Sequence, residues 1–479
     1  MQESNKPAKS LHFIGIAGSG MCPLAILAKS KGYQITGSDL GSGRNLSLLK
    51  NSDIKVFAEH REQNAYNANA LVVSSAIKHD NPEIQWALRK NIPIYHRSDL
   101  LAELAKPYHL ITVAGTHGKT TTSAILSYLL DILKQDPMAV VGGHMHHFDA
   151  SWHLGKGKYF VAEADESDGS FLKYHPKTAI LNNIDKDHLD HYGDFKGVKE
   201  AFRKYLNNIN DDGIAIISVD DEFSYAAYDK YQGKKISYGS LRDCDFQASS
   251  IQIDGQYVSF QLKHKGTQFN CKLKSIGLHN VSNALAALAA VKSLGLSIDC
   301  AIKALTSFPG VSRRLSIIHE SPSITIIDDY AHNPGKIVAS IKAVHNSFVN
   351  HDVFVIFEPH RFSRLDTMYN EFIHSFTKAS QVYVTPIFAA GEKHSDQHNP
   401  NTIAEDIQKS SSVDSYPYLN EEQLIRDISH RNHIKSVILT VGAGDSSKIA
   451  FAIKRYTIAK QKNTSSKGTP SQSEAEKKE

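Results

Sequence analysis

Short apolar runs recur along the chain, and each is followed by glycines or polar side chains. Such runs predict buried strands, and the segments between them place apolar residues at helical spacing. The clearest predicted strands are 11–14, 33–37, 70–76, 110–113, 159–162, 178–184, 213–219, 323–327, 352–357, 381–385 and 436–441. Because strand after strand ends in polar or glycine-rich residues, the pattern predicts an α/β fold with mostly parallel sheets and ligands at their carboxyl edges.

The strand predicted at 110–113 leads into Ala-Gly-Thr-His-Gly-Lys-Thr-Thr-Thr at 114–122 and then into helical periodicity. This arrangement suits a nucleotide triphosphate, since backbone N–H groups and the lysine face the phosphates and the hydroxyl reaches Mg²⁺. The match to G-x-x-x-x-G-K-[ST] is incomplete, because Val113 stands where the first glycine belongs. An ordinary strand-to-helix turn is the alternative, and Lys119 and Thr120 make it the weaker interpretation.

The amino-terminal segment is typical of a βαβ unit. A strand at 11–14 enters a glycine turn at 15–21, a helix follows over 22–31, and the strand at 33–37 ends near Asp39. A glycine turn with an acidic residue at the tip of the second strand indicates nucleotide binding. The spacing G-x-x-G-x-G does not favour a nicotinamide cofactor, and a tight turn alone also requires glycine.

Carboxylates gather where the strand at 159–162 ends, namely Glu163, Asp165, Glu166 and Asp168. They would repel one another unless a cation neutralised them, so a metal or phosphate site is favoured over a solvated loop. After the next strand, His188 stands between Asp187 and Asp190. It is either a ligand oriented by its neighbours or a hydrogen-bonded loop histidine.

Farther along, alternation over 247–274 predicts β-hairpins with a turn at Asp254-Gly255. An alanine-rich helix follows, and its first turn carries Asn280 and Asn283. Amides there either cap the helix or read an adenine edge. At 479 residues the chain should hold about three domains of ~150 residues each. We expect a Rossmann-like domain at 1–106, a central P-loop ATPase-like domain at 107–312, a Rossmann-like domain at 313–460 and a disordered tail at 461–479.

Composition excludes several classes of protein. Apolar residues make up 41% and charged residues 22%, as in a globular protein with ample core. The net charge of +4 is too small to indicate nucleic acid or an anionic membrane as partner. The four cysteines form no C-x-x-C pair, which fits a reducing cytosol. No membrane span or secretory signal is evident, so we expect a cytoplasmic protein without membrane insertion.

Several motifs together resemble those of the Mur ligases, the ATP-dependent amide-bond ligases of peptidoglycan precursor synthesis. They lie at 14–21, 114–122, 163–168, 187–190, 279–283, 328–332 and 359–364. The resemblance extends from residue 11 to about residue 454. Within the family, the chain is most similar to the members that join L-alanine to UDP-N-acetylmuramate.

The resemblance implies a role for each motif. The first domain would bind UDP-N-acetylmuramate through Gly15, Ala17, Gly18, Ser19, Gly20, Asp39 and Ser74. ATP would meet Gly115, Thr116, His117, Gly118, Lys119, Thr120, Thr121, Asn280, Asn283, Arg314 and Asp329. Mg²⁺ would be held by Thr120, Glu163 and His188, and L-alanine would be received by Tyr330, His360, Arg361 and Arg364. The residues expected to act in catalysis are Lys119, Glu163, His188, Arg314 and His332.

The implied reaction accounts for this set of residues. A carboxylate oxygen first takes the γ-phosphoryl group of ATP, and Lys119 and Mg²⁺ neutralise the charge during transfer. The amine of alanine then attacks the acyl phosphate, and phosphate leaves from the tetrahedral intermediate. Arginines suit the carboxylate of the amino acid, because their planar fork binds it through two hydrogen bonds.

The chain departs from the family pattern at a few positions. Asn333 stands where a second histidine is usual, Phe362 where tyrosine is common, and Ser446 where an apolar residue usually follows Gly-Ala-Gly-Asp. Some relatives carry a carbamoylated lysine at a position that corresponds by spacing to Phe202, so we expect no carbamate here. These departures affect local contacts rather than the reaction.

Two other functions compete with this interpretation. One is the recycling ligase that joins an intact tripeptide to the same sugar nucleotide. The other is a regulatory nucleotide-binding module without catalysis, against which the intact Lys119, Thr120, Glu163 and His188 argue. The sequence leaves the oligomeric state open.

Overall fold

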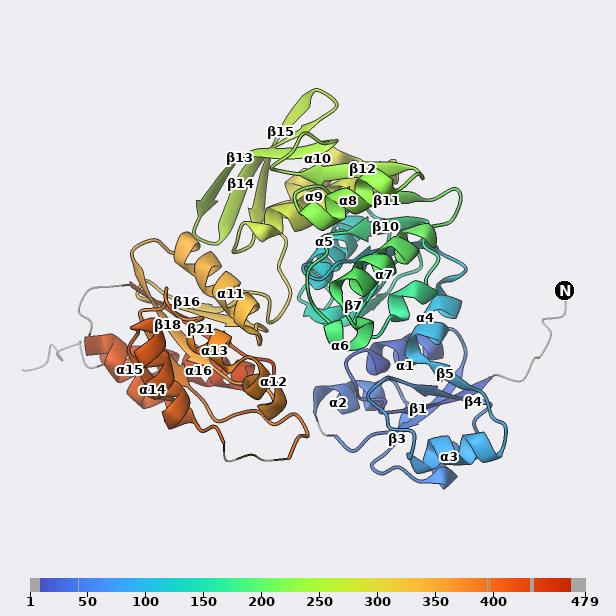
Figure 1. The fold of residues 1–479 in the computed structure, drawn as a ribbon, viewed down its shortest axis with the longest axis horizontal. Helices are drawn as coiled ribbons and strands as arrows, with labels where there is room; N and C mark the ends of the chain where they lie inside the picture. Colours follow the sequence, from blue (N-terminus) through green and yellow to red (C-terminus); the bar gives the residue numbers. More distant parts are fainter. Residues whose placement is uncertain (1–8, 42, 394, 396, 431–434, 467–479) are drawn as a thin grey trace, which may run out of the picture. The chain divides into compact units, whose positions relative to one another are not determined.

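The computed structural model describes residues 9–41, 43–393, 395, 397–430 and 435–466 (Figure 1). They form two compact units. Unit 1 runs to Gln252 and includes Ser259–Lys274 and His279–Val311. Unit 2 comprises Ile253–Val258, Ser275–Leu278 and the chain from Ser312 onward. The fold is a three-domain α/β arrangement with mostly parallel sheets, as predicted, and unit 1 contains the first two domains.

The N-terminal domain has a parallel sheet in the order β3-β2-β1-β4-β5. Its elements are β1 (Ser10–Ile14), α1 (Met21–Ser30), β2 (Gln34–Ser38), α2 (Arg44–Asn51), β3 (Lys55–Phe57), η1 (Glu62–Ala65), β4 (Ala70–Val73), α3 (Pro82–Arg89), β5 (Ile94–His96) and α4 (Arg97–Ala105). Phe13 and Ile14 of the central strand are fully buried, and so is Leu27 of α1. Burial on both faces explains the continuous apolar runs of this sheet.

The central sheet has the order β15-β14-β13-β12-β11-β10-β6-β9-β7-β8. Its strands are β6 (His109–Ala114), β7 (Met138–Met145), β8 (Ala150–Leu154), β9 (Tyr159–Glu163), β10 (Thr178–Leu181), β11 (Ile214–Ser218), β12 (Lys235–Gly239), β13 (Phe246–Asp254), β14 (Tyr257–His264) and β15 (Thr267–Lys274). The helical elements are α5 (Lys119–Ile132), η2 (Ser170–Lys173), α6 (Leu189–Tyr192), α7 (Phe195–Asn207), α8 (Glu222–Lys230), α9 (His279–Ser293) and α10 (Ile298–Leu305). The strands from β12 to β7 are parallel, and β8 pairs antiparallel with β7.

The C-terminal sheet has the order β16-β17-β21-β18-β19-β20, parallel except for β16. Its elements are β16 (Ser316–Glu320), β17 (Ile324–Asp329), α11 (Pro334–Ser347), β18 (His351–Phe357), α12 (Phe362–Thr367), α13 (Tyr369–Ile373), β19 (Gln381–Val384), α14 (Pro400–Ser411), β20 (Ser415–Pro417), α15 (Glu421–His430), β21 (Lys435–Val441) and α16 (Ser446–Ser466). In β18, Val355 and Phe357 belong to one core cluster and Phe354 and Ile356 to another. The alternation shows that the strand carries a core on each face.

Three predictions differ from the structure in detail. β4 and β10 end earlier than predicted, because Ser74 O accepts from Ile77 N in a turn and Ile184 N donates to Asp221 Oδ2. Asp254 ends β13, so the turn is centred on the next two residues, of which Gly255 has φ +55°.

The predicted disordered tail is wrong at its start, because α16 continues to Ser466. Extending a helix costs little once its first turns are formed. Residues 467–479 of that prediction lie outside the described residues. Among the helices that the structure describes, none is long and apolar enough to cross a bilayer.

Candidate active site

The phosphate loop of the central domain connects β6, an interior strand of the sheet, to α5. Gly115 has φ +131° and Gly118 has φ +81°, a region that L side chains rarely adopt. A Cβ at Gly118 would collide with the carboxamide oxygen of Asn283 and lie 2.9 Å from Asn182 Nδ2. Val113 is fully buried within β6, so the missing glycine of the motif is a strand position rather than a loop position.

The ammonium group of Lys119 is fixed at this loop. Its Nζ donates to Gly115 O at 2.7 Å and pairs with Glu166 Oε2 at 2.7 Å and Oε1 at 2.9 Å. Glu166 is only 2% exposed. A phosphate entering the loop would compete with this carboxylate for the lysine. Glu166 belongs to the acidic stretch for which the sequence favours a metal or phosphate site, and its pairing with Lys119 emerges only from the structure.

The three predicted Mg²⁺ ligands stand at or after the carboxyl ends of three strands of the central sheet, namely β6, β9 and β10. Thr120 lies in the first turn of α5, Glu163 ends β9, and His188 precedes α6 with φ +55°. Glu163 Oε1 accepts from Gly142 N at 2.6 Å. His188 Nε2 lies 3.8 Å from Glu166 Oε1. The buried Glu166 carboxylate therefore links the lysine to the histidine.

The other acidic residues of this stretch lie near Arg97, the first residue of α4 in the N-terminal domain. Arg97 Nη2 lies 3.7 Å from Asp165 Oδ2 and 3.9 Å from Asp168 Oδ2. Ser75 Oγ donates to Asp168 Oδ2 at 2.6 Å. Burial raises the pKa of Asp168, but hydrogen bonds from Ser170 and Ser75, with the charge of Arg97, lower it to about 2. Asp168 is therefore a permanent anion between the first two domains.

The residues inside the loop are tied to the segment after β10. Thr116 N donates to Asn183 O at 3.2 Å, and His117 N donates to Asn183 Oδ1 at 2.8 Å. Asp185 N donates to Thr116 Oγ1 at 2.9 Å, and its carboxylate lies 3.2 Å from His117 Nε2. Thr121 is half-buried in the first turn of α5. These bonds set the shape of the loop before any nucleotide binds.

The two residues predicted to contact adenine take part in hydrogen bonds that support the phosphate loop. Asn280 and Asn283 are 4% and 5% exposed, and Asn283 Nδ2 donates to Asn280 Oδ1 at 2.8 Å. Thr122 Oγ1 donates to Asn283 Oδ1 at 3.1 Å, and Asn182 Nδ2 donates to Thr122 Oγ1 at 3.1 Å. Their contact with adenine stays a prediction, while the hydrogen bonds give them a supporting role.

The glycine loop of the N-terminal domain is held by the end of β2. Gly15, with φ +74°, donates its N–H to Ser38 O at 2.8 Å. Asp39 Oδ2 accepts from Ala17 N at 2.8 Å, and Asp39 Oδ1 accepts from Gly41 N at 2.8 Å. Asp39 thus shapes the glycine loop, and its predicted contact with the sugar nucleotide stays a prediction.

The open side of this loop carries the other predicted sugar-nucleotide residues. Gly18 and Ser19 are exposed, and Gly20 is half-buried beside Arg97, whose Nη1 would lie 3.5 Å from a Cβ at that glycine. Ser74 follows β4 at the same edge of the sheet. Sequence reasoning missed Arg97, and its position directly after the strand β5 is the signal that would have found it.

In unit 2, the predicted amino-acid residues form a cationic cluster. Arg364 Nη1 lies 2.9 Å from His360 Nδ1, and the rings of His332 and His360 are 5.8 Å apart. His332 Nδ1 lies 2.7 Å from Tyr330 O, and Arg361, with φ +66°, precedes α12. Burial lowers the pKa of both histidines to about 4, and the charge of Arg364 acts in the same direction. At neutral pH the arginines therefore carry the positive charge.

Asp329 is the last residue of β17 and directly precedes Tyr330 of this cluster. It is 8% exposed, with Oδ2 accepting from Leu315 N at 2.8 Å and Oδ1 accepting from Ala331 N at 2.7 Å. Burial raises the pKa of Asp329, and the Arg314 charge opposes the rise. The Arg314 guanidinium carbon is 5.5 Å from the centre of the Tyr330 ring. Direct contact of Asp329 or Arg314 with ATP stays a prediction; in the structure Asp329 supports the backbone of the cluster.

The residues that depart from the family pattern cap a helix, accept a hydrogen bond or are buried. Asn333 caps α11, accepting a backbone N–H of its first turn at 2.9 Å. Ser446 Oγ accepts from Arg313 Nη2 at 3.1 Å. Phe362 is buried, and Phe202 lies in the core with its ring 5.4 Å from that of Phe171.

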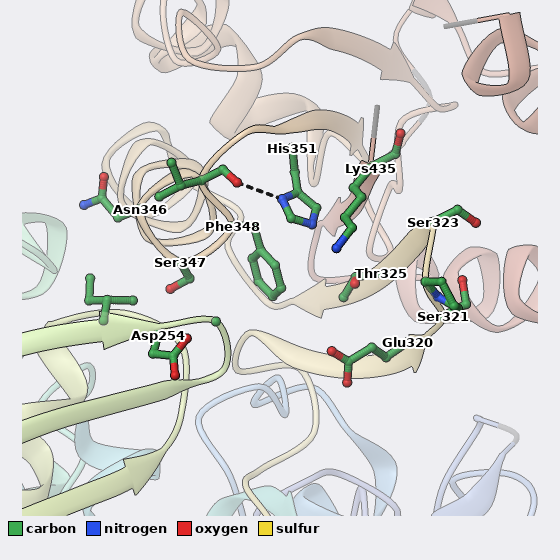
Figure 2. Close-up of a pocket in the computed structure, with 15 residues that line it drawn as sticks. Asp254, Glu320, Ser321, Ser323, Thr325, Asn346, Ser347, Phe348, His351 and Lys435 are labelled. Carbon is green, nitrogen blue, oxygen red and sulfur yellow. Dashed lines mark hydrogen bonds between the residues drawn. The ribbon is translucent and has the colours of Figure 1, made fainter. Parts of the chain in front are cut away.

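A pocket of about 710 Å³ opens elsewhere in unit 2, at the amino ends of β17, β18 and β21 (Figure 2). Glu320, Lys435, His351 and Thr325 contribute to its lining. Within the described residues, none of the predicted site residues lines it. The predicted residues lie instead at the carboxyl edges of the sheets, where open α/β sheets bind ligands.

Three family models match the chain in succession. Residues 10–109 match "Mur ligase family, catalytic domain", residues 113–291 match "Mur ligase middle domain", and residues 313–444 match "Mur ligase, glutamate ligase domain". Together they account for nearly the whole described chain.

Curated relatives extend the likeness. The UDP-N-acetylmuramate–L-alanine ligase of Magnetococcus marinus is 36% identical over 455 residues, covering 92% of this chain and 96% of its own. That of Endomicrobium trichonymphae is 37% identical over 438 residues, covering 91% and 96%. The solved UDP-N-acetylmuramate–alanine ligase of Thermotoga maritima has a TM-score of 0.79 at 29% identity, covering 94% and 99%. A murein peptide ligase from Psychrobacter arcticus shares the fold, with a TM-score of 0.67 at 24% identity, covering 94% and 98%. The chain belongs to the Mur ligase family.

Proposed function

We propose that this enzyme joins L-alanine to the carboxylate of UDP-N-acetylmuramate, converting ATP to ADP and phosphate, in the cytoplasmic synthesis of peptidoglycan precursors. The observation that carries the proposal is the presence of two glycine loops in unit 1, one with Lys119 and one without a lysine. The curated relatives bear the name of this activity. The four cysteines are free thiols, which supports a reducing compartment.

In the first step, a carboxylate oxygen of the sugar nucleotide attacks the γ-phosphorus of ATP and ADP leaves. Lys119 already points its ammonium group at the loop backbone, so it is positioned to neutralise phosphate charge during transfer. Glu166 holds that ammonium until a phosphate replaces the carboxylate. Asn283 and Asn182 keep the loop in shape, which orients the phosphates in advance.

The donor set at the end of β9 and the start of α5 fits Mg²⁺. Thr120 and Glu163 offer the oxygen ligands that this cation prefers, and phosphate oxygens and water would complete an octahedral shell. His188 is the less suitable donor, because Mg²⁺ binds nitrogen weakly. When bound, the cation would neutralise charge on the transferred phosphoryl group.

In the second step, the amine of L-alanine attacks the acyl phosphate carbon, loses a proton and expels phosphate from the tetrahedral intermediate. Arg361 and Arg364 are the permanent cations of the unit 2 cluster and suit the carboxylate of alanine. His332 and His360 stay neutral at the pH of the reaction, because burial lowers their pKa to about 4. They therefore recognise polar groups by hydrogen bonds rather than by charge.

An assay of phosphate release shows which acceptor the enzyme uses. Purified enzyme, ATP, Mg²⁺ and UDP-N-acetylmuramate should release phosphate on addition of L-alanine and not on addition of the L-alanyl-γ-D-glutamyl tripeptide. Activity only with the tripeptide would overturn the proposal in favour of a recycling ligase. No release with either, despite ATP binding, would favour the regulatory module.

A further inference from the structure

A second cluster of metal-ligating side chains lies at the other end of α5. Asp131 is in the last turn of that helix, Asp136 precedes β7, and His153 is on β8. One ligand atom from each of the three lies within 4.8 Å of the other two. Three separate segments of the central domain therefore converge on one point with two carboxylates and an imidazole.

Asp136 is held in place by the backbone around it. Its Oδ2 accepts from Lys156 N at 2.8 Å, its Oδ1 lies 2.9 Å from His153 Nε2, and its carbonyl accepts from Gly157 N at 2.8 Å. The residue has φ +42°, a conformation that aspartate and asparagine tolerate better than most. A Cβ at Gly157 would collide with the carbonyl oxygen of Gln135. The carboxylate thus has a fixed position before any ion binds.

The neighbouring aromatic rings fix the imidazoles. His147 Nε2 lies 2.7 Å from Asp131 Oδ2, and its ring packs edge-on to Tyr128 with centroids 4.9 Å apart. Phe148 stacks on His153 at 4.3 Å. His147 is therefore placed to orient the Asp131 carboxylate from outside, the arrangement that supports ligands in metal sites.

The local charges favour a cation here. Asp131 stands at the carboxyl end of α5, where the helix dipole is negative, and the last turn of α5 has no basic residue. Two carboxylates at this separation repel each other unless a cation lies between them. Lys156 adds positive charge near Asp136, and each carboxylate already has a histidine partner, His147 at 2.7 Å from Asp131 and His153 at 2.9 Å from Asp136. That ion-pair arrangement is the competing account of the cluster.

We propose that Asp131, Asp136 and His153 bind a divalent transition-metal ion, with Zn²⁺ the best match and water as the fourth ligand. Zn²⁺ takes four ligands from imidazole and carboxylate groups, whereas Ca²⁺ requires six or more oxygens and Mg²⁺ avoids imidazole. The site is separate from the phosphate loop, since residues 119 to 131 span about 18 Å along the helix. The ion would clamp α5, the following turn and β8 together, which is a structural role.

Calorimetric titration of the full-length, EDTA-treated enzyme with Zn²⁺ tests the proposal. Excess Mg²⁺ in every sample competes with Zn²⁺ at the nucleotide site. Asp136→Asn removes the anionic ligand, while its amide oxygen still accepts from Lys156 N and the positive φ is tolerated. His153→Gln removes the nitrogen ligand. His398→Gln is the matched control, because His398 forms a comparable pair with Asp366 at 2.9 Å outside the cluster.

We expect one Zn²⁺ site in the wild type and in His398→Gln, and affinity at least about 100-fold weaker in Asp136→Asn and His153→Gln. Zn²⁺ should raise the melting temperature of the wild type and of His398→Gln, and it should leave that of the two cluster variants unchanged. Circular dichroism without metal establishes that each variant is folded. Asp136→Asn and His153→Gln should lose Zn²⁺ binding alike, because each removes one ligand of the same site. Equal Zn²⁺ binding by all four proteins, or no Zn²⁺ binding by the wild type, would overturn the proposal and leave the cluster as ion pairs.

Discussion

Unit 1 contains two glycine loops that share one local design and differ in charge. Each connects a parallel strand to the start of a helix, β1 to α1 in one case and β6 to α5 in the other. The loop at 115–118 leads into Lys119, whose ammonium group pairs with the buried Glu166. The loop at 15–20 has no lysine, and Asp39 accepts one of its backbone N–H groups.

This difference in charge predicts that the loop at 15–20 only binds a ligand, whereas the loop at 115–118 also takes part in phosphoryl transfer. Backbone N–H groups at a helix N-terminus suffice to hold a phosphate group that only has to stay in place. A phosphoryl group that moves also develops charge, and a nearby lysine stabilises that charge. We therefore expect changes in the loop at 115–118 to affect turnover and changes in the loop at 15–20 to affect the affinity for the sugar nucleotide.

The largest effect should come from Lys119→Ala. Turnover should fall about 10³-fold, because the charge-stabilising donor is lost, and the dissociation constant of UDP-N-acetylmuramate should hardly change. Phosphate release and calorimetry measure the two quantities, with Lys106→Ala as a control at an exposed lysine. Loss of sugar-nucleotide binding in Lys119→Ala would contradict the separation of the two loops.

Gly118→Ala should rank second. The new Cβ would collide with Asn283 at a φ of +81°, and the displaced loop should lower kcat/KM for ATP about 10²-fold. Gly295→Ala is the matched control, since Gly295 has a similar φ of +75° with nothing within 4 Å of a Cβ. It should reduce the free energy of unfolding by about 1 kcal/mol and leave kcat/KM unchanged. Equal kinetic losses in both variants would show that backbone strain, rather than loop shape, matters.

Asp39→Ala should have a smaller effect, confined to the other loop. Without the acceptor for Ala17 N, the loop loses about 1–2 kcal/mol of support, which corresponds to a KM for UDP-N-acetylmuramate about tenfold higher. The KM for ATP should stay the same. Asp39→Asn keeps an oxygen acceptor and should fall between wild type and Asp39→Ala in steady-state kinetics. A rise in both KM values would mean that the two loops are coupled.

Gly15→Ala should give the smallest effect. Its φ is +74°, but the Cβ would lie 2.9 Å from Ile77 Cδ1, the flexible end of a side chain that can move. The KM for UDP-N-acetylmuramate should rise less than about threefold, with a loss of about 1 kcal/mol in unfolding free energy. The double variant Gly15→Ala/Ile77→Ala removes the contact between the new Cβ and the Ile77 side chain. Any effect that remains then comes from the positive φ at residue 15. A tenfold or larger rise in KM would place Gly15 in direct contact with the ligand.

Prediction from sequence succeeded where the signal is local. The strands at both loops and the helices after them follow from apolar spacing, and the structure contains each of them. The sequence places Val113, which stands where the phosphate-loop motif has a glycine, in a predicted strand, and the structure confirms it as a residue of β6. Sequence reasoning missed Arg97 and did not pair Ser75 with Asp168 or Glu166 with Lys119, because the partners in each pair lie far apart in the sequence.

Burial gives two of the predicted residues a supporting role beside the expected one. Asp329 and Asn283 are predicted to contact ATP; in the structure both are buried and form hydrogen bonds that support neighbouring residues. A motif shows that a residue is required and does not distinguish contact with the ligand from support of the residues that make contact. That distinction depends on packing around the side chain.

The sequence by itself determined the alternation of strands and helices, the two glycine loops and the family, because these depend on local backbone preferences and on motif spacing. Only the tertiary structure decided which carboxylate pairs with Lys119, which arginine lies beside Gly20, and that Asp131, Asp136 and His153 meet at one point. These contacts join segments that are distant along the chain, and strand register and helix packing set their geometry.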